Sequence, residues 1–394
     1  MTHLHKKSTI KSLAMVTAAI VLSTGLARAE PGITKDEIHI GGTLGITGPI
    51  AAICTSVVEA AQAHFKKIND AGGINGRKIR YEVLDDAYSA QRSIGNARRL
   101  IEQDKVFAIF AGCGTATAAA VLTVVENTDV PYLFPYAGLD KLIQPVKKNV
   151  YSLVPLYSDQ MSAIIPYVLS KSPTKTAVME SVNIAGHEGW RKAAREKLEA
   201  AGVNVQLDLL IDIQAADRAP YVLQIKEKNP DLLLMMESAP NAARFVIEMQ
   251  RQNWKPKMMT GYATLTDETF LKAAAETMEG IMIAPGFVLP PTVPQSKGCV
   301  DELAVYKKDL APTHFSMYGC LAAKVMVEAL RRAGPDLTRA KLINALDSIK
   351  DYDSGISGKV NFSAQQHMGL DSVFPVAIEK GQFKVVGAPI QWKK

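Results

Sequence analysis

The residues of this chain best placed to do chemistry form a run of small side chains, Gly-Cys-Gly-Thr-Ala-Thr at residues 112–117. The run follows a buried apolar segment and precedes a helical pattern, so we expect it at a helix N-terminus. Free backbone N–H groups and the helix dipole suit such a site to a carboxylate or another anion. Thr115 has two compatible roles, capping the helix or hydrogen-bonding a ligand. Cys113 would need a nearby base to act as a nucleophile. Because His39 is expected inside a strand, we do not expect Cys113 to have this role.

Two further runs follow expected strands, at residues 45–50 and 130–138. The carboxyl ends of parallel strands are where open α/β sheets bind their ligands. The first run is equally compatible with a simple turn, and it lacks the Gly-x-Gly-x-x-Gly spacing of a dinucleotide site. In the second run, Tyr136 has a flat apolar face and a polar tip, which suit both a pocket wall and core packing.

The remaining polar residues form no catalytic constellation. The sequence contains no Gly-x-Ser-x-Gly, no Walker loop, no His-Glu-x-x-His and no Cys-x-x-Cys. His187 and Glu188 are adjacent, and adjacent side chains on a helix diverge, so we interpret them as a helix start and a ligand contact. We therefore expect a protein that is not an enzyme and that uses no metal or other cofactor.

The elements that position these runs alternate short β-branched segments with longer amphipathic ones, a pattern typical of βαβ units. Strands are expected at residues 38–42, 78–84 and 106–111, with a helix at 56–71 between the first two. The pattern restarts after Pro155 and indicates a second Rossmann-like lobe. A chain of 394 residues also exceeds the size at which single cores usually split.

The first 29 residues read as a secretory signal peptide. A basic head precedes an apolar run at residues 13–26, and Ala-Arg-Ala closes the segment. The run is too short and too interrupted to favour a membrane anchor. We predict cleavage after Ala29 and a periplasmic, not membrane-embedded, product. Four of the basic residues behind the net charge of +6 lie in this leader, so the mature chain is nearly balanced, which argues against a nucleic-acid partner.

Several motifs spread along the chain resemble the type I periplasmic binding proteins of the leucine/isoleucine/valine-binding family. The most specific is Asn-x-x-Gly-Gly-Ile-x-Gly at residues 69–76. The other matches are Asp85-Asp86, the Cys-x-x-x-Thr loop at residues 113–117, Pro135, Glu188-Gly189 and Met278-Glu279-Gly280.

The resemblance implies an α/β fold of two Rossmann-like lobes with parallel central sheets, joined by three hinge crossovers near Val154, Pro285 and Ser357. Lobe one would comprise residues 30–153 and 286–356, and lobe two residues 154–285 and 357–394. A small-molecule ligand would be enclosed between the lobes by hinge closure. The implied partner is the membrane permease of an ABC importer, and the chain is expected to be a monomer.

Ligand contacts are implied by the resemblance, residue by residue. The family holds an amino acid's carboxylate with lobe-one hydroxyls and its ammonium with a lobe-two acid, whereas this sequence has Gly114, Gly138 and Ala263 at three of those positions. A buried ammonium without a counter-charge costs on the order of several kcal/mol. The predicted ligand-binding residues are Ile53, Cys113, Gly114, Thr115, Tyr136, Ala137, Gly138, Tyr157, His187, Ser238, Tyr262 and Ala263.

We therefore predict a carboxylate-bearing, aromatic or otherwise apolar solute, in a cleft widened by the glycines and walled by tyrosines. Glu237, next to Ser238, keeps an amino-acid or amide ligand open as an alternative, and a ligand-sensing receptor domain is an alternative of another class.

The four cysteines allow three disulfide pairings, among which the sequence alone does not choose. The family's usual bridge to the cysteine loop starts from the position of Tyr88 here. Since Cys54 lies in the neighbouring loop, the resemblance implies Cys54–Cys113, with Cys299–Cys320 as the second pair.

Overall fold

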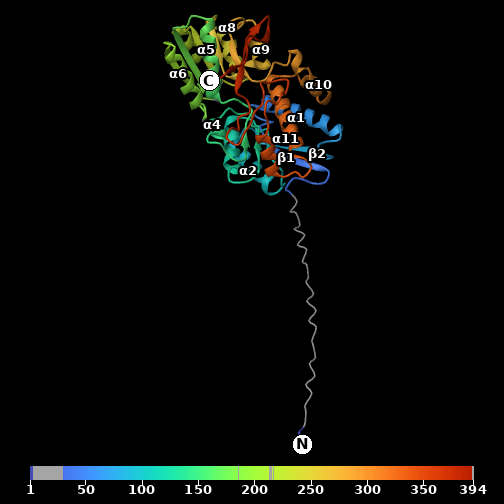
Figure 1. The fold of residues 1–394 in the computed structure, drawn as a ribbon. Helices are drawn as coiled ribbons and strands as arrows, with labels where there is room; N and C mark the ends of the chain where they lie inside the picture. The colour runs from blue at the N-terminus through green and yellow to red at the C-terminus, as the bar shows by residue number, and fades with distance from the viewer. Residues whose placement is uncertain (3–29, 185, 213–214, 216, 393–394) are drawn as a thin grey trace.

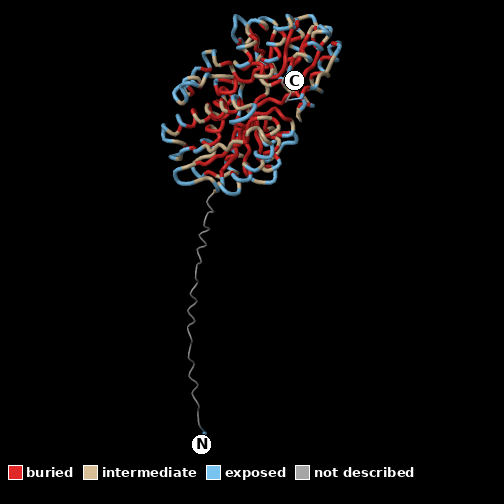
Figure 2. Tube along the Cα trace, turned by 180° about the vertical axis from the view of Figure 1, so that it is seen from behind, coloured by how far each residue is buried: buried red, intermediate tan, exposed pale blue. Residues whose placement is uncertain are grey.

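A computed structural model describes residues 1–2, 30–184, 186–212, 215 and 217–392. The predicted signal peptide lies almost wholly outside these described residues. The chain forms two lobes, one containing α1, α2 and β1 and the other containing α5, α6 and α8 (Figure 1). Buried residues concentrate inside both lobes, and exposed residues line their outer surfaces (Figure 2).

Lobe one is built on a five-stranded parallel sheet in the order β2-β1-β3-β4-β5. Its strands are β1 (Glu37–Leu44), β2 (Lys78–Asp85), β3 (Ile109–Phe110), β4 (Tyr132–Leu133) and β5 (Val150–Tyr151). Its helices are α1 (Ala51–Asp70), α2 (Ala90–Glu102), α3 (Thr115–Val125), α4 (Asp140–Ile143), α10 (Lys297–Tyr306), α11 (His314–Ala333) and α12 (Arg339–Asp347). The 3-10 turn η2 (Pro294–Ser296) precedes α10.

Lobe two repeats the architecture with a four-stranded parallel sheet in the order β7-β6-β8-β9. Its strands are β6 (Thr176–Val182), β7 (Asn204–Ile211), β8 (Leu232–Met236) and β9 (Met258–Gly261). Its helices are α5 (Tyr157–Lys171), α6 (Glu188–Ala200), α7 (Ala219–Lys228), α8 (Ala239–Arg251), η1 (Ala263–Thr266) and α9 (Glu268–Ala274).

A small antiparallel sheet completes the fold. Its strands are β10 (Ile283–Gly286), β11 (Ser372–Glu379), β12 (Gln382–Val385) and β13 (Ile390–Gln391). β11 pairs with β10, β12 and β13, and a bridge between Met259 and Met282 connects this sheet to β9. The C-terminal strands therefore extend lobe two, although they are distant from it in the sequence.

The third passage between the lobes lies close to β11. Residues 358–370 contact lobe one: Ser152 N donates to His367 O at 2.9 Å, and Phe362 stacks on Phe134 at a ring distance of 6.1 Å. The predicted lobe boundaries remain a proposal, and these contacts favour a third crossover after Gly369 instead of near Ser357.

Both implied disulfides are present. Cys54 in the first turn of α1 is bonded to Cys113, and Cys299 in α10 is bonded to Cys320 in α11. The first bridge fixes α1 to the loop before α3. This loop lies at the edge of the lobe-one sheet, where the runs at residues 45–50, 112–117 and 130–138 meet. In the described part of the chain, no helix combines the length and the apolar character needed to cross a membrane.

Candidate functional site

A cavity of about 520 Å³ lies between the two lobes. Most of the predicted ligand-binding residues line it, since the strand ends that carry them face one another there. They are Ile53, Cys113, Gly114, Thr115, Tyr136, Tyr157, His187, Ser238 and Tyr262. Ala137, Gly138 and Ala263 are not part of this wall. Ala137 follows Tyr136 and Ala263 follows Tyr262 in the sequence, and Gly138 lies against the Tyr157 ring. Whether any of these residues contacts a ligand remains a prediction.

Tyr88 fills the space that Gly114 was expected to open. Gly114 precedes α3 with φ 99° and ψ 143°, a conformation that is essentially restricted to glycine. A Cβ atom there would lie 2.5 Å from the Tyr88 ring and 3.0 Å from Ile50 Cδ1. Ala116 N–H at the same helix end donates to the Tyr88 hydroxyl, whose pKa burial raises to about 12. The glycine therefore accommodates an aromatic ring and does not widen the cleft.

Buried Asp86 holds the Tyr88 loop in place. Its carboxylate accepts hydrogen bonds from Thr43 Oγ1 at 2.9 Å, Ser93 Oγ at 3.0 Å and Tyr88 N at 2.9 Å. Tyr88 itself has a positive φ of 60°. The sequence analysis noted Tyr88 only as the position where the family's disulfide cysteine is absent. It therefore missed that Tyr88 lines the cavity.

The second glycine behaves in the same way. A Cβ on Gly138 would lie 2.6 Å from Tyr157 Cδ1, so the absence of a side chain lets this ring pack against the loop. The Tyr157 hydroxyl lies 2.8 Å from Thr115 Oγ1, at the N-terminus of α3. Tyr157 also makes an edge-to-face contact with Tyr262, with ring centroids 5.4 Å apart. Tyr157 and Tyr262 of lobe two thus form one part of the wall, and the Tyr157 hydroxyl connects it to Thr115 of lobe one.

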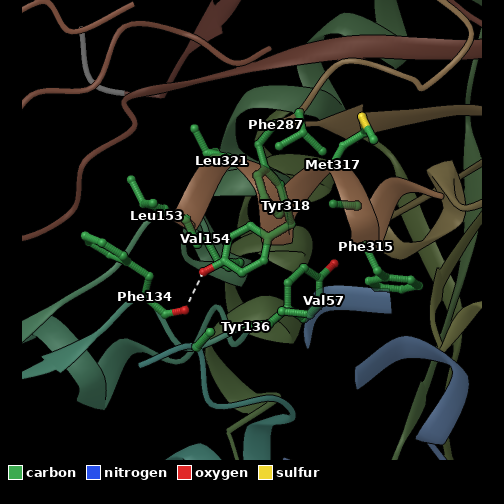
Figure 3. Close-up of a cluster of buried hydrophobic side chains, with 14 of the residues drawn as sticks. Val57, Phe134, Tyr136, Leu153, Val154, Phe287, Phe315, Met317, Tyr318 and Leu321 are labelled. Atoms are coloured by element: carbon green, nitrogen blue, oxygen red, sulfur yellow. Dashed lines mark hydrogen bonds between the residues drawn. The ribbon is translucent and has the colours of Figure 1, made fainter. Parts of the chain in front are cut away.

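Tyr136 has both of the roles that its sequence context suggested. It lines the cavity, and it also packs against Phe315 and Tyr318 with ring centroids 5.2 and 4.9 Å apart. Figure 3 shows this cluster, in which the Tyr318 hydroxyl donates to the Phe134 carbonyl at 2.7 Å. The aromatic core of lobe one therefore fixes the Tyr136 ring that faces the cavity.

Glu237 is the carboxylate of the cavity wall, and its charge is matched by a buried arginine. Arg218 Nη2 lies 3.5 Å from Glu237 Oε1, and the two side chains are 2% and 0% exposed. Asn241 Nδ2 donates to the other carboxylate oxygen at 3.1 Å. The sequence reasoning weighed Glu237 only as an alternative contact, and Arg218 carried no signal that would have identified it.

Two basic side chains also line the cavity. Burial lowers the pKa of His187 to about 4, and its ring donates to the Val182 carbonyl, so the imidazole is neutral at pH 7. Arg244, on the exposed side of α8, has no ion-pair partner among the residues that the structure describes. Among the described residues, the wall therefore carries one acid that is paired with a cation and one cation without an acidic partner.

Direct contacts join the lobes at two places. A Cβ on Gly186 of lobe two would lie 2.6 Å from Leu139 Cδ1 and 3.1 Å from Thr115 Cγ2 of lobe one. Elsewhere, His314 N of lobe one donates to Glu268 Oε2 of lobe two at 2.8 Å. The two lobes are thus in direct contact at both places.

Comparison with known proteins agrees with this geometry. The family model described as "Periplasmic binding protein" matches residues 37–382. Among curated relatives, "Leu/Ile/Val-binding protein homolog 7" of Brucella abortus is 25% identical over 353 residues, covering 85% of this chain and 87% of the relative.

Two solved structures share the fold. A branched-chain amino acid ABC transporter protein from Thermus thermophilus with bound valine superposes with a TM-score of 0.82 at 16% identity, covering 91% of this chain and 97% of that one. An ABC transporter solute-binding protein from R. palustris in complex with benzoate gives 0.79 at 18% identity, covering 90% and 97%. The chain therefore belongs to the periplasmic binding protein family.

Proposed function

We propose that this chain binds a small carboxylate-bearing, aromatic or otherwise apolar solute between its lobes and presents it to the permease of an ABC importer. In this proposal the protein is exported with cleavage after Ala29, and it releases the solute chemically unchanged. The lobes open and close about their crossovers, so that the solute is enclosed on both sides.

The charge balance of the cavity wall is the observation that carries this proposal. Glu237 is already paired with Arg218, whereas Arg244 lacks an acidic partner within the described residues. The N-terminus of α3 also faces the cavity at Thr115 and adds partial positive charge. An anionic group is favoured here, and an ammonium group finds no spare counter-charge.

The shape and polarity of the wall support an apolar body on the ligand. Tyr136, Tyr157 and Tyr262 present flat rings, and Ile53 and Val182 add aliphatic surface. The R. palustris neighbour crystallised with benzoate has such a ligand, an aromatic ring bearing one carboxylate. The neighbour with bound valine supports the alternative, an amino acid, for which Glu237 would have to bind the ammonium group.

Calorimetric titration of the mature protein with benzoate, octanoate, leucine and valine tests the proposal. We expect binding of at least one of the two acids and no binding of either amino acid. Arg244→Gln should weaken acid binding about fivefold, since an accessible ion pair contributes up to about 1 kcal/mol.

Arg251→Gln is the matched control, because Arg251 lies on the same helix but pairs with Glu248 and does not line the cavity. Tight binding of leucine or valine, with neither acid bound, would contradict the proposed ligand class.

A further inference from the structure

Two buried acids lie side by side at the carboxyl edge of the lobe-two sheet. Glu180 lies near the end of β6, and Glu237 directly follows β8. The parallel register pairs Glu180 with Met235 and Ser181 with Met236, which places both carboxyl groups at the same edge. Both residues are 0% exposed, and only Glu237 belongs to the cavity wall.

Arg218, immediately before α7, supplies the opposite charge. Its guanidinium carbon lies 5.3 Å from the centroid of the Phe245 ring, and the arginine is buried. Within the described residues, its side-chain nitrogens have no hydrogen-bond partner, although Nη2 lies 3.5 Å from Glu237 Oε1. Because Arg218 has no side-chain hydrogen bond within the described part of the chain, we expect it to act on Glu237 mainly through its charge.

Arg218 is the positive charge beside the two acids. Burial and the adjacent Glu237 raise the pKa of Glu180 well above its usual value. Burial also raises the pKa of Glu237, and the charge of Arg218, 3.5 Å away, opposes that shift by stabilising the Glu237 carboxylate. Removing the arginine would leave a buried carboxylate at the cavity wall without its counter-charge, although Asn241 would still donate a hydrogen bond to it.

We propose that Arg218 determines the charge preference of the cavity by cancelling the carboxylate of Glu237, so that ammonium-bearing ligands are rejected. Arg218 does not line the cavity, so it acts as a positioning residue through Glu237. The proposal rests on the proposed function, because it explains how a site with a buried glutamate can prefer an anion.

The test replaces the arginine with a neutral and with a charged side chain. Arg218→Met should improve the affinity for phenethylamine at least tenfold and weaken that for benzoate, while Arg218→Lys should keep the wild-type preference. Adding Glu237→Gln to Arg218→Met should abolish the gained amine binding. No amine gain in a folded Arg218→Met protein, as judged by circular dichroism, or the same gain in Arg218→Lys, would overturn the proposal.

Glu237→Gln alone keeps the inference testable if Arg218→Met does not fold. This variant leaves Arg218 as an unopposed cation, so benzoate affinity should rise severalfold and phenethylamine affinity should not rise. A tenfold loss of benzoate affinity would refute the inference.

A ligand-free readout separates this inference from the proposed function. In a double-mutant cycle on urea unfolding, the effects of Arg218→Met and Glu237→Gln should couple by at least tenfold in the unfolding constant. Additive effects would refute the charge pairing itself. A wild-type protein that binds neither acid but shows the coupling would refute only the proposed ligand class.

Discussion

Replacing Gly114 with serine should destabilise the protein strongly, although the family resemblance places a serine at this position. The glycine backbone has φ 99° and ψ 143°, and a side chain held there costs about 1–3 kcal/mol. The new Cβ would also lie 2.5 Å from the Tyr88 ring, and such overpacking costs about 1–3 kcal/mol. We therefore expect Gly114→Ser to lower the free energy of unfolding by roughly 2–6 kcal/mol.

Urea unfolding followed by circular dichroism measures this loss, and Tyr88→Ala supplies the control background. Without the Tyr88 ring the steric part of the cost should disappear, so Gly114→Ser should lose only the backbone part there. Equal destabilisation in both backgrounds would show that the ring does not fill the space above Gly114. A Gly114→Ser protein as stable as wild type would refute both parts of the reasoning.

Two further predictions concern stability. Replacing Cys54 and Cys113 with serine should lower the free energy of unfolding by about 2–4 kcal/mol, because the bridge closes a loop with a sequence separation of 59 residues. Urea unfolding of the variant measures this loss. An unchanged unfolding midpoint would contradict the prediction. Burial and Asp267 raise the pKa of Glu268 to about 8 from 4.5, so the folded state keeps a proton that the unfolded chain releases. This contribution to stability is complete below about pH 4.5 and is lost as pH rises through about 8. Glu268→Gln should therefore reduce the decrease in the free energy of unfolding between these two pH values. An unchanged pH dependence in urea unfolding would show that Glu268 does not cause the decrease.

The fold could be predicted largely from local patterns and from the family motifs. Alternating strands and helices indicate two parallel sheets, and the structure has them. α1 begins at Ala51, earlier than the helix expected from residue 56, because the apolar periodicity marks only the buried face and not the helix start. The pairing of β11 with β10 joins segments far apart in the chain, and no local pattern contains such a long-range partner.

The cavity wall was predictable where a single strand end determines it. Residues such as Thr115 and Tyr136 lie where the carboxyl end of a parallel strand must place them. The effect of Gly114 was not predictable, because it depends on Tyr88 from another loop. The neutralisation of Glu237 depends likewise on Arg218, which precedes a different helix and has no motif around it.

A crystal structure of the mature protein with benzoate tests the central claim most directly. We predict the ring between Tyr136, Tyr157 and Tyr262, with the carboxylate oxygens within hydrogen-bond distance of Thr115 or Arg244. Benzoate bound outside the space between the lobes, or a copurified amino acid with its ammonium group on Glu237, would contradict the account.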